Sequence, residues 1–379
     1  MKKVLMLASV ASMIEKFNMS NIRILMDLGY EVHIAANFEY SNTSSENRII
    51  EFKKELEGLG IRHYHIDFSR KVTSISSHIL AYRQIAELMS QNQYEFVHCH
   101  SPIGGVCGRI AAKRTRTKVI YTAHGFHFFK GAPLKNWLLY YPIERALANY
   151  TDVLITINHE DYNRASKSFK AKKVKYIPSV GLNTEEFNSI VVDKEAKRRE
   201  IAVPEDAIMF LSVGELDSRK NHETPIRALA NINNKNLYYV ICGTGHLLEY
   251  LKNLCKELGV EKNVLLLGYR TDIAELCKSS DIYIFPSQRE GLGMAALEGM
   301  SVGLPLISSY INGIRDYTED GKTGFCLHPF DINGFGIAME QLAGDADLRR
   351  KMGIYNQSVV ENFEIQKVNK IMSGIYQDK

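Results

Sequence analysis

The sequence predicts an α/β protein of two Rossmann-like domains, each a doubly wound parallel sheet, that face each other across a central cleft. Its 379 residues are enough for two domains with a core each. Short apolar runs alternate with segments whose apolar residues recur every three or four positions, which indicates strands and helices of parallel sheets. The alternation stops once, over the polar residues 184–199, and this break indicates a domain junction.

The first half of the chain supplies the strands of an N-terminal domain, which we predict over residues 1–180. Helical spacing is clearest at residues 79–89 and 137–148. The apolar runs that we interpret as strands are residues 4–8, 32–36, 63–66, 96–99, 119–122, 153–157 and 174–177. We expect a C-terminal helix, residues 363–379, to complete this domain.

The second half predicts a C-terminal domain over residues 181–362. Its expected strands are residues 208–213, 238–242, 264–267, 282–285 and 306–308, and its last helical segments are residues 334–342, 348–363 and 368–376. Ligands of doubly wound sheets bind beyond the carboxyl ends of the strands. The cleft between the two domains is therefore the expected active site.

Composition excludes several classes of protein. An apolar content of 45% and a charged content of 24% are typical of a soluble globular chain. A net charge of +4, without an RRM-, KH- or HTH-like pattern, gives no reason to expect a nucleic-acid partner. The six cysteines form no CxxC pair and suit a reducing compartment. No run reaches the roughly 18 apolar residues of a spanning helix, so we expect a cytoplasmic protein.

One stretch of the chain is basic and aromatic. No acidic residue stands between Glu95 and Glu144, where the basic residues are Arg109, Lys113, Arg114, Arg116, Lys118, Lys130 and Lys135. One interpretation is a surface for an anionic membrane or a pyrophosphate-bearing acceptor. The residues assigned to that surface are His127, Lys130, Lys135 and Trp137. The other interpretation is solvated loop charges around a helix whose aromatic residues are core.

A glycine-flanked pair of glutamates is the strongest chemical signal. Glu290 and Glu298 flank the run Gly291-Leu292-Gly293, which follows the strand at residues 282–285 and opens a helix. Glycines let the backbone approach a ligand, and the N–H groups of a helix start bind phosphate. Carboxylates are strong acceptors for sugar hydroxyl pairs. Taken alone, the pair could also be two ordinary helix charges, and its setting favours a site.

Two further motifs follow strands of the C-terminal domain. Residues 213–222 (VGELDSRKNH) place Arg219 and Lys220 where cations can neutralise a departing diphosphate. Residues 242–246 (CGTGH) form a glycine turn through Gly243 and Gly245. Such a turn is as often structural as ligand-binding.

A histidine motif follows a strand of the N-terminal domain. His124 in the run YTAHGFH comes directly after the strand at residues 119–122, so we expect it to point into the cleft. A histidine there can donate to a sugar hydroxyl or accept a proton. For His98 and His100, on the preceding strand, we favour a core position.

The segment from Glu290 to Glu298 resembles the signature of the family 4 (GT4) retaining glycosyltransferases, which have the GT-B fold. Residues 285–287 (FPS) precede it and residues 303–307 (GLPLI) follow it. The resemblance covers essentially the whole chain. Residues 124–145 (HGFHFFKGAPLKNWLLYYPIER) are similar to bacterial capsular and exopolysaccharide glycosyltransferases. This implies transfer of a hexose or N-acetylhexosamine from a UDP-linked nucleotide-sugar to a saccharide on an undecaprenyl-pyrophosphate carrier, at the inner face of the plasma membrane.

The resemblance also implies roles for individual residues. Glu290 holds the sugar, His124 contacts it from the other domain and Lys220 binds the diphosphate, and these three are the implied catalytic residues. Glu298 holds the ribose. The other implied donor-binding residues are Gly214, Arg219, Gly243, Gly245, Tyr269, Arg270, Gly291, Leu292 and Gly293. No Asp-x-Asp motif offers a divalent-cation site, so we expect neither a metal nor another cofactor.

The chain departs from the family pattern at two places. Glu215 stands where many members carry an arginine, and Arg219 is the expected substitute. Many members have a glycine-rich loop after the first strand, whereas residues 8–17 here contain no glycine. We expect that segment to be a loop whose Ser9 and Ser12 face the acceptor.

Two other functions compete with glycosyl transfer. A nucleotide-sugar epimerase or hydrolase on the same fold would need no acceptor. A non-catalytic nucleotide-sugar-binding regulator would not need charged side chains on both sides of the cleft.

Overall fold

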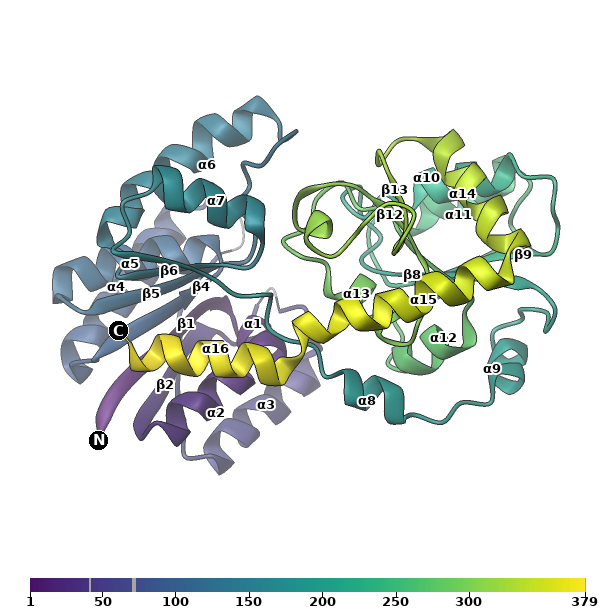
Figure 1. Ribbon diagram of the computed structural model, residues 1–379. Helices are drawn as coiled ribbons and strands as arrows, with labels where there is room; N and C mark the ends of the chain where they lie inside the picture. The colour runs from purple at the N-terminus through teal and green to yellow at the C-terminus, as the bar shows by residue number, and fades with distance from the viewer. Residues whose placement is uncertain (41, 70–72, 379) are drawn as a thin grey trace. The chain divides into compact units, whose positions relative to one another are not determined.

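The computed structural model describes residues 1–40, 42–69 and 73–378. The chain forms two compact units (Figure 1): the N-terminal unit, Met1–Gly181 with Gln366–Lys379, and the C-terminal unit, Leu182–Ile365. The junction expected at residues 180 and 181 lies within one residue of this division. The C-terminal helix α16 (Ile365–Gln377) joins the N-terminal unit from Gln366 onward.

The N-terminal unit is built on a seven-stranded parallel sheet in the order β3-β2-β1-β4-β5-β6-β7. The strands are β1 (Lys2–Val10), β2 (Tyr30–Asn37), β3 (Arg62–His65), β4 (Phe96–His100), β5 (Lys118–Ala123), β6 (Val153–Thr156) and β7 (Lys173–Tyr176). The helices are α1 (Ala11–Phe17), α2 (Met19–Asp27), α3 (Glu46–Gly58), α4 (Ile75–Asn92), α5 (Pro102–Thr115), α6 (Leu134–Leu147) and α7 (His159–Ser168). Each strand expected in this half of the sequence is present.

The two faces of this sheet are covered by different helices. Side chains alternate along a strand, so Cys99 of β4 faces α5 while His98 faces α16. Close packing of α5 depends on its glycines, because a Cβ at Gly108 would lie 2.5 Å from the sulfur of Cys99. Tyr376 of α16 covers the opposite face and its hydroxyl lies 2.8 Å from Nδ1 of His98.

A buried ion pair joins α5 to α6. Nη2 of Arg109 lies 2.8 Å from Oε2 of Glu144, and the guanidinium stacks 4.0 Å from the ring centre of Tyr121. Arg109 is buried. Of the two interpretations of the basic stretch, the surface one does not apply to Arg109, because its charge is neutralised inside the fold.

The C-terminal unit has a six-stranded parallel sheet in the order β10-β9-β8-β11-β12-β13. Its strands are β8 (Ile208–Val213), β9 (Leu237–Cys242), β10 (Val264–Gly268), β11 (Ile282–Phe285), β12 (Leu306–Ser309) and β13 (Gly324–Leu327). Its helices are α8 (Thr184–Ser189), α9 (Lys194–Glu200), α10 (Glu223–Ala230), α11 (Leu248–Glu257), α12 (Ile273–Ser279), α13 (Met294–Ser301), α14 (Ile332–Gly344) and α15 (Ala346–Val360). Strand β13 was not predicted.

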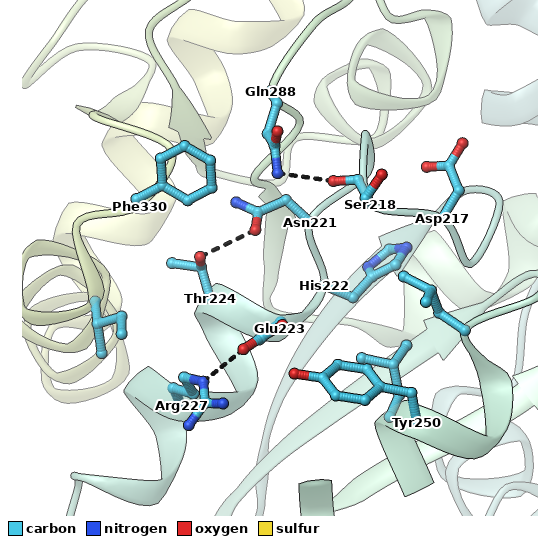
Figure 2. Close-up of a pocket in the computed structure, with 13 residues that line it drawn as sticks. Asp217, Ser218, Asn221, His222, Glu223, Thr224, Arg227, Tyr250, Gln288 and Phe330 are labelled. Atoms are coloured by element: carbon cyan, nitrogen blue, oxygen red, sulfur yellow. Dashed lines mark hydrogen bonds and ion pairs between the residues drawn. The ribbon is translucent and has the colours of Figure 1, made fainter.

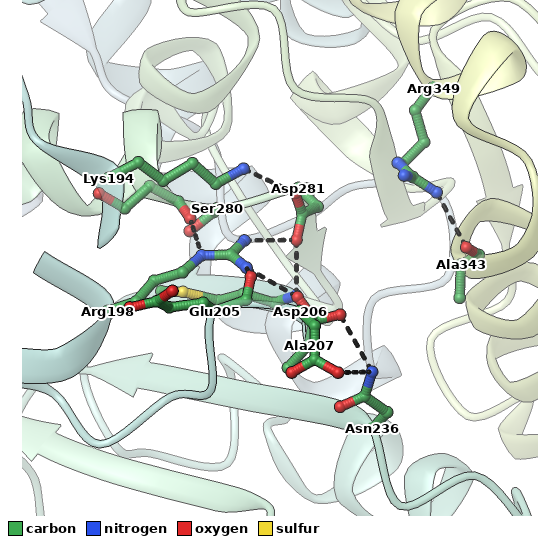
Figure 3. A network of polar contacts seen from close by, with 12 residues as sticks. Lys194, Arg198, Glu205, Asp206, Ala207, Asn236, Ser280, Asp281, Ala343 and Arg349 are labelled. Carbon is green, nitrogen blue, oxygen red and sulfur yellow. Dashed lines mark hydrogen bonds and ion pairs between the residues drawn. The ribbon is translucent and has the colours of Figure 1, made fainter. Parts of the chain in front are cut away.

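A buried network fixes the start of the two central strands of this unit (Figure 3). The carboxylate of Asp281 accepts hydrogen bonds from the backbone N–H of Met209 (2.8 Å), from Arg198 (2.6 Å) and from Lys194 (2.9 Å). Arg198 also donates to the carbonyl oxygens of Ser279 and Ala207. Since β8 and β11 carry the candidate site at their other ends, this network holds those ends in register.

The segment expected to be a loop, residues 8–17, is regular structure. Strand β1 continues to Val10, which pairs with Asn37, and α1 begins at Ala11. Val10 has an extended backbone (φ −137°, ψ 146°) directly before the helix, so the turn needs no glycine here. The expectation of a loop is wrong for this reason.

Candidate functional site

The loops after β8 and β9 lie against each other at the carboxyl end of the C-terminal sheet. The backbone N–H of Gly214 donates to the carbonyl of Cys242 (2.9 Å), and that of Leu216 donates to Thr244 (2.9 Å). Gly243 has a φ of 154°, and a Cβ there would lie 1.8 Å from the carbonyl oxygen of Gly214. A Cβ at Gly245 would lie 2.3 Å from the carbonyl oxygen of Leu216. Glycine is therefore required at both positions for this loop packing.

Lys220 and Glu290 form the central ion pair of the site. Nζ of Lys220 donates to Oε1 of Glu290 at 2.6 Å, and Nη1 of Arg219 donates to the same oxygen at 3.1 Å. The side chains of Lys220 and Glu290 are only 13% and 11% exposed. Burial opposes ionisation of Glu290, but Lys220 and Arg219 outweigh it and hold the pKa of this carboxyl below its usual value.

Neighbouring groups hold Lys220 in place. Its backbone N–H donates to Oδ1 of Asp217 at 2.8 Å, and its ammonium lies 5.0 Å from the ring centre of Phe285, at the end of β11. Gly214 leaves room for the aliphatic part of the Lys220 side chain, because a Cβ on residue 214 would lie only 3.1 Å from its carbons. These contacts hold the ammonium of Lys220 beside the loop that carries Glu290.

Helix α13 begins directly after that loop. Its N-cap, Gly293, has a φ of 95°, and a Cβ there would lie 2.6 Å from the ring of Phe285. As a glycine, Gly293 offers no side-chain acceptor to the N–H groups of the first turn, which suits an anion at this end. The neighbouring loop also packs closely, because a Cβ at Gly313 would lie 2.0 Å from the carbonyl oxygen of Gly291. Leu292 between the two glycines is buried.

Glu298 on α13 differs from Glu290 in its surroundings. Burial raises the pKa of Glu298 to about 7, and Lys220 opposes this rise. Among the described residues, its carboxylate forms no hydrogen bond and no close ion pair. The two carboxyl groups are therefore in one site but in different states, with Glu290 ionised and Glu298 titrating near neutral pH.

Tyr269 and Arg270 follow β10 beside Gly243. The N–H of Gly243 donates to the carbonyl of Gly268 at 2.7 Å, which brings this loop to the same sheet edge. Tyr269 is exposed. Arg270 pairs with Asp272 and Glu200, so its charge is already neutralised within the unit. Glu215, the departure from the family pattern, is exposed.

A cavity of about 400 Å³ lies beside the loop that carries Lys220, here called the lysine loop, on the side away from Glu290 (Figure 2). Its lining includes Asp217, His222, Arg227, Tyr250 and Phe330, but not Lys220, Glu290 or Glu298. Asn221, at the edge of this cavity, has a φ of 57° and donates from Nδ2 to the carbonyls of Pro286 (3.0 Å) and Pro329 (2.6 Å). This asparagine ties the lysine loop to the Glu290 loop.

The sequence analysis missed Asp217 and Asn221. A signal for both exists, because Asp three residues before Lys220 is typical of a side chain that caps a turn, and asparagine tolerates a left-handed conformation. The resemblance to a family directs attention to the cations Arg219 and Lys220 instead.

His124 of the N-terminal unit follows β5 and is partly buried. Its Nε2 lies 3.1 Å from Nδ1 of His100, and both residues line a small recess with Asn18, Asn21 and Ser179. Burial lowers the pKa of His124 to about 4. The ring is therefore neutral at neutral pH.

Ser9 and Ser12, expected to face an acceptor, are buried. The hydroxyl of Ser9 lies 2.7 Å from that of Ser101 and accepts the N–H of Gly104. The hydroxyl of Ser12 accepts the N–H of Thr43 at 3.0 Å. Both hydroxyls thus bond inside the unit, and the expectation of an open position is wrong for them.

Helix α6 presents a different face from the one expected. Trp137 packs inward, 5.7 Å from the ring of Phe128 and 4.5 Å from the guanidinium of Arg164. His127 stacks 4.6 Å from Tyr140. Lys130 and Lys135 are exposed, as are Leu134, Leu138 and Leu139 of this helix. Trp137 therefore does not belong to the outer surface, whereas the two lysines do.

Among residues 1–40, 42–69 and 73–378, no group of three or more His, Cys, Asp or Glu is placed to hold a metal ion. In the same part of the chain, no helix has the length and apolar character to cross a membrane. All six cysteines are free thiols.

Two family models match the chain. Residues 3–158 match "Glycosyl transferase 4-like" and residues 193–359 match "Glycosyl transferases group 1". A Bacillus subtilis (strain 168) protein, "Putative glycosyltransferase EpsD", is 35% identical over 99% of this chain and 96% of its own length. An Escherichia coli protein, UDP-Gal:alpha-D-GlcNAc-diphosphoundecaprenol alpha-1,3-galactosyltransferase, is 32% identical over 75% of this chain and 76% of its own length.

A solved structure shares the fold. The Anabaena protein HepE, in complex with UDP and glucose, superposes with a TM-score of 0.80 at 17% identity over 100% of both chains. The pair of parallel-sheet units is the GT-B architecture, so the predicted fold class is confirmed.

Proposed function

The chain belongs to the family 4 (GT4) glycosyltransferases, and on that premise we propose that it moves a hexose or N-acetylhexosamine from a UDP-sugar to a saccharide on an undecaprenyl-pyrophosphate carrier. Transfer proceeds with retention at the anomeric carbon. The observation that carries the proposal is the buried Lys220–Glu290 pair at the start of α13. Two relatives support its finer parts: the E. coli enzyme is named for UDP-Gal and a diphosphoundecaprenol acceptor, and HepE was solved with UDP.

In this proposal the diphosphate enters where Glu290 now holds two cations. Lys220 and Arg219 turn to the incoming anion, and the first turn of α13 adds N–H donors. Glu290, released from them, accepts hydrogen bonds from sugar hydroxyls. Glu298, which has no close cation of its own, accepts from the ribose hydroxyls.

The chemical step exchanges one bond at the anomeric carbon. The acceptor oxygen attacks from the face that the diphosphate leaves, the bond to the diphosphate oxygen breaks, and that oxygen takes the acceptor proton. Lys220 and Arg219 stabilise the charge that develops on the leaving diphosphate. His124 orients the sugar. We propose that the protein needs no metal for this step, so transfer should persist in EDTA and should not rise when Mg²⁺ or Mn²⁺ is added.

An acceptor with a polyprenyl carrier lies in a membrane, and we propose that α6 is the surface that contacts this membrane. The glycan assembled there is a capsular or other cell-surface polysaccharide in this proposal. Leu134 and Leu138 are 72% and 71% exposed, and Leu139 and Ile143 are also exposed. Glu144, the acidic residue of α6, is buried against Arg109, so the outward side of the helix carries positive charge alone. An apolar ridge flanked by cations fits an anionic bilayer.

Vesicle flotation tests this surface. The protein should float with vesicles of phosphatidylglycerol and phosphatidylcholine and bind less to phosphatidylcholine alone. The double variant Leu134→Gln, Leu138→Gln should lose flotation but keep transfer to a short-chain, water-soluble acceptor. The matched control is Ile337→Gln, Ile354→Gln, which changes two exposed apolar residues of the C-terminal unit. Equal flotation of both double variants would remove α6 from the proposal.

A donor panel tests the reaction itself. UDP-glucose, UDP-galactose, UDP-GlcNAc and UDP-GalNAc are each incubated with a synthetic polyprenyl-diphosphate GlcNAc acceptor, and the mass of the acceptor is measured. A gain of one hexose or N-acetylhexosamine supports the proposal. Conversion of the UDP-sugar without acceptor would identify an epimerase or hydrolase, and binding of UDP-sugars without any conversion would identify a regulator.

A lysine variant links the reaction to the site. Lys220→Met should lower the transfer rate by about 100-fold, the usual effect of losing a group that stabilises transition-state charge. Lys252→Met is the matched control, because Lys252 pairs with Glu249 on an exposed helix surface. Equal rates for the two variants would show that Lys220 has no part in the reaction.

A further inference from the structure

Four side chains on one face of the N-terminal sheet form a row that ends at His124. In the parallel register Met6 of β1 pairs with His98 of β4, and His100 pairs with Thr122 of β5. Paired residues of parallel strands point to the same face, as do residues two apart on one strand. His98, His100 and Met6 are all buried.

The row is connected by short contacts. Nε2 of His100 lies 3.1 Å from the sulfur of Met6, and Nδ1 of His100 lies 3.1 Å from Nε2 of His124. The rings of His98 and His100 are tilted against each other with centres 4.1 Å apart. Among the described residues, the ring of His124 has one hydrogen-bond partner, which is His100.

The chemistry of Met6 decides where the protons of this row reside. A thioether sulfur accepts a hydrogen bond but has no proton to donate. The contact between Met6 and His100 is therefore favourable only when Nε2 of His100 carries the proton. A neutral imidazole carries one proton, so Nδ1 of His100 is then bare and accepts from His124.

We infer that Met6, acting through His100, fixes the tautomer of His124, so that Nε2 of His124 carries its proton and Nδ1 presents a bare lone pair. His100 is a positioning residue in this arrangement. The consequence for catalysis rests on the proposed function: His124 accepts a hydrogen bond from a sugar hydroxyl and does not donate one. Donors whose hydroxyl at that position is replaced by an acceptor alone, such as a fluorine, should therefore be poor substrates.

Burial keeps the row neutral, as this logic requires. Burial lowers the pKa of His98 to about 3 and that of His124 to about 4, and it lowers the pKa of His100 well below its usual value. In the opposite arrangement, bare Nε2 of His100 would face the lone pairs of the sulfur at 3.1 Å. Two buried acceptors would then face each other without a proton between them, which is unfavourable.

Histidine tautomers can be read directly without substrate. Protein labelled with ¹⁵N-histidine is examined by long-range ¹H–¹⁵N correlation, with His100→Asn and His124→Asn variants for assignment. We expect both His100 and His124 as the Nε2–H tautomer. A protonated Nδ1 on neutral His124 would overturn the inference, whether or not the protein proves to be a glycosyltransferase.

Two variants test the source of the preference. Met6→Leu keeps the buried volume but removes the acceptor, so His124 should populate both tautomers and kcat/KM for the donor should fall about five- to tenfold, the value of one hydrogen bond. Met339→Leu is the matched control, since Met339 is a buried methionine of the C-terminal unit. An unchanged His124 spectrum in Met6→Leu would contradict the role of Met6.

Substitutions at His100 separate positioning from packing. In His100→Asn the amide oxygen can replace Nδ1 as the acceptor for His124, whereas His100→Leu removes that acceptor. We expect His100→Asn to retain most of the donor kcat/KM and His100→Leu to lose it, with KM for the acceptor unchanged in both. Equal losses in the two variants would show that His100 serves packing alone.

Discussion

Replacing Glu290 with glutamine probes the ion pair at the centre of the proposed donor site. Two cations share one carboxylate oxygen, Lys220 at 2.6 Å and Arg219 at 3.1 Å, and solvent screens the pair little. Glutamine keeps the shape and an accepting oxygen but removes the charge. We expect the free energy of unfolding to fall by about 2 kcal/mol, which lowers the Tm of a unit of this size by about 4–8 °C.

The same variant should respond more strongly to UDP. In the native chain the diphosphate has to displace Glu290 from both cations, whereas in Glu290→Gln the cations are available. Saturating UDP should therefore raise the Tm of the variant by more than it raises that of the native protein. The transfer rate should fall by about 100-fold or more, because the sugar loses a charged acceptor.

Differential scanning calorimetry with and without UDP, followed by the transfer assay, measures these effects. Glu249→Gln is the matched control, since Glu249 forms an exposed pair with Lys252 at 2.8 Å. If Glu290→Gln matched this control in Tm, in UDP response and in turnover, the reasoning from the Lys220–Glu290 pair would be refuted.

Three other substitutions have definite expected results. Burial raises the pKa of Glu298 to about 7, so its protonated form stabilises the fold fully below pH 4.5, and this stability is lost as the pH rises to about 7. Glu298→Gln should remove this pH dependence of the free energy of unfolding, which amounts to about 3 kcal/mol at most. Urea unfolding at pH 5 and pH 8 measures it. Gly293→Ala should lower stability by about 2 kcal/mol or more and weaken UDP binding in calorimetry, because of its φ of 95° and the 2.6 Å approach to Phe285; a native-like Tm would contradict this. Glu144→Gln should lower the free energy of unfolding by about 3 kcal/mol, because buried Arg109 loses its carboxylate partner. An unchanged midpoint in chemical denaturation would mean that water reaches the pair.

Most of the strands could be predicted because buried parallel strands are apolar runs bounded by polar residues. Strand β13 gives a weaker signal, because it has four residues and begins at Gly324, and glycine is depleted in strands. Gly324 is required there because a Cβ would lie 1.7 Å from the carbonyl oxygen of Leu306. Such a close approach to another strand leaves no trace in the local sequence pattern.

The residues of the candidate site were found more readily than their contacts. Lys220 and Glu290 are 70 positions apart, and only the folded sheet brings their loops together. Their sequence motifs predicted binding of an anion and of a sugar, but not the pairing between them. His100 was interpreted as a core residue, which describes its burial but not its contact with His124.

The orientation of α6 could not be predicted for a different reason. Its sequence is apolar on both faces, so helical periodicity alone does not tell which face packs inward. The choice depends on partners distant in sequence, because Arg164 and Phe128 together hold Trp137. Leu134, Leu138 and Leu139 are left on the outside as a result.

Helix α16 gives the chain an order of assembly. Tyr376 covers Phe96 and His98, so the sheet of the N-terminal unit lacks part of its cover until α16 is made. About 195 residues separate Gly181 from Tyr376, and translation at roughly 5–20 residues per second delays that helix by about 10–40 seconds. The unit made first on the ribosome is thus completed last, after the whole C-terminal unit has emerged.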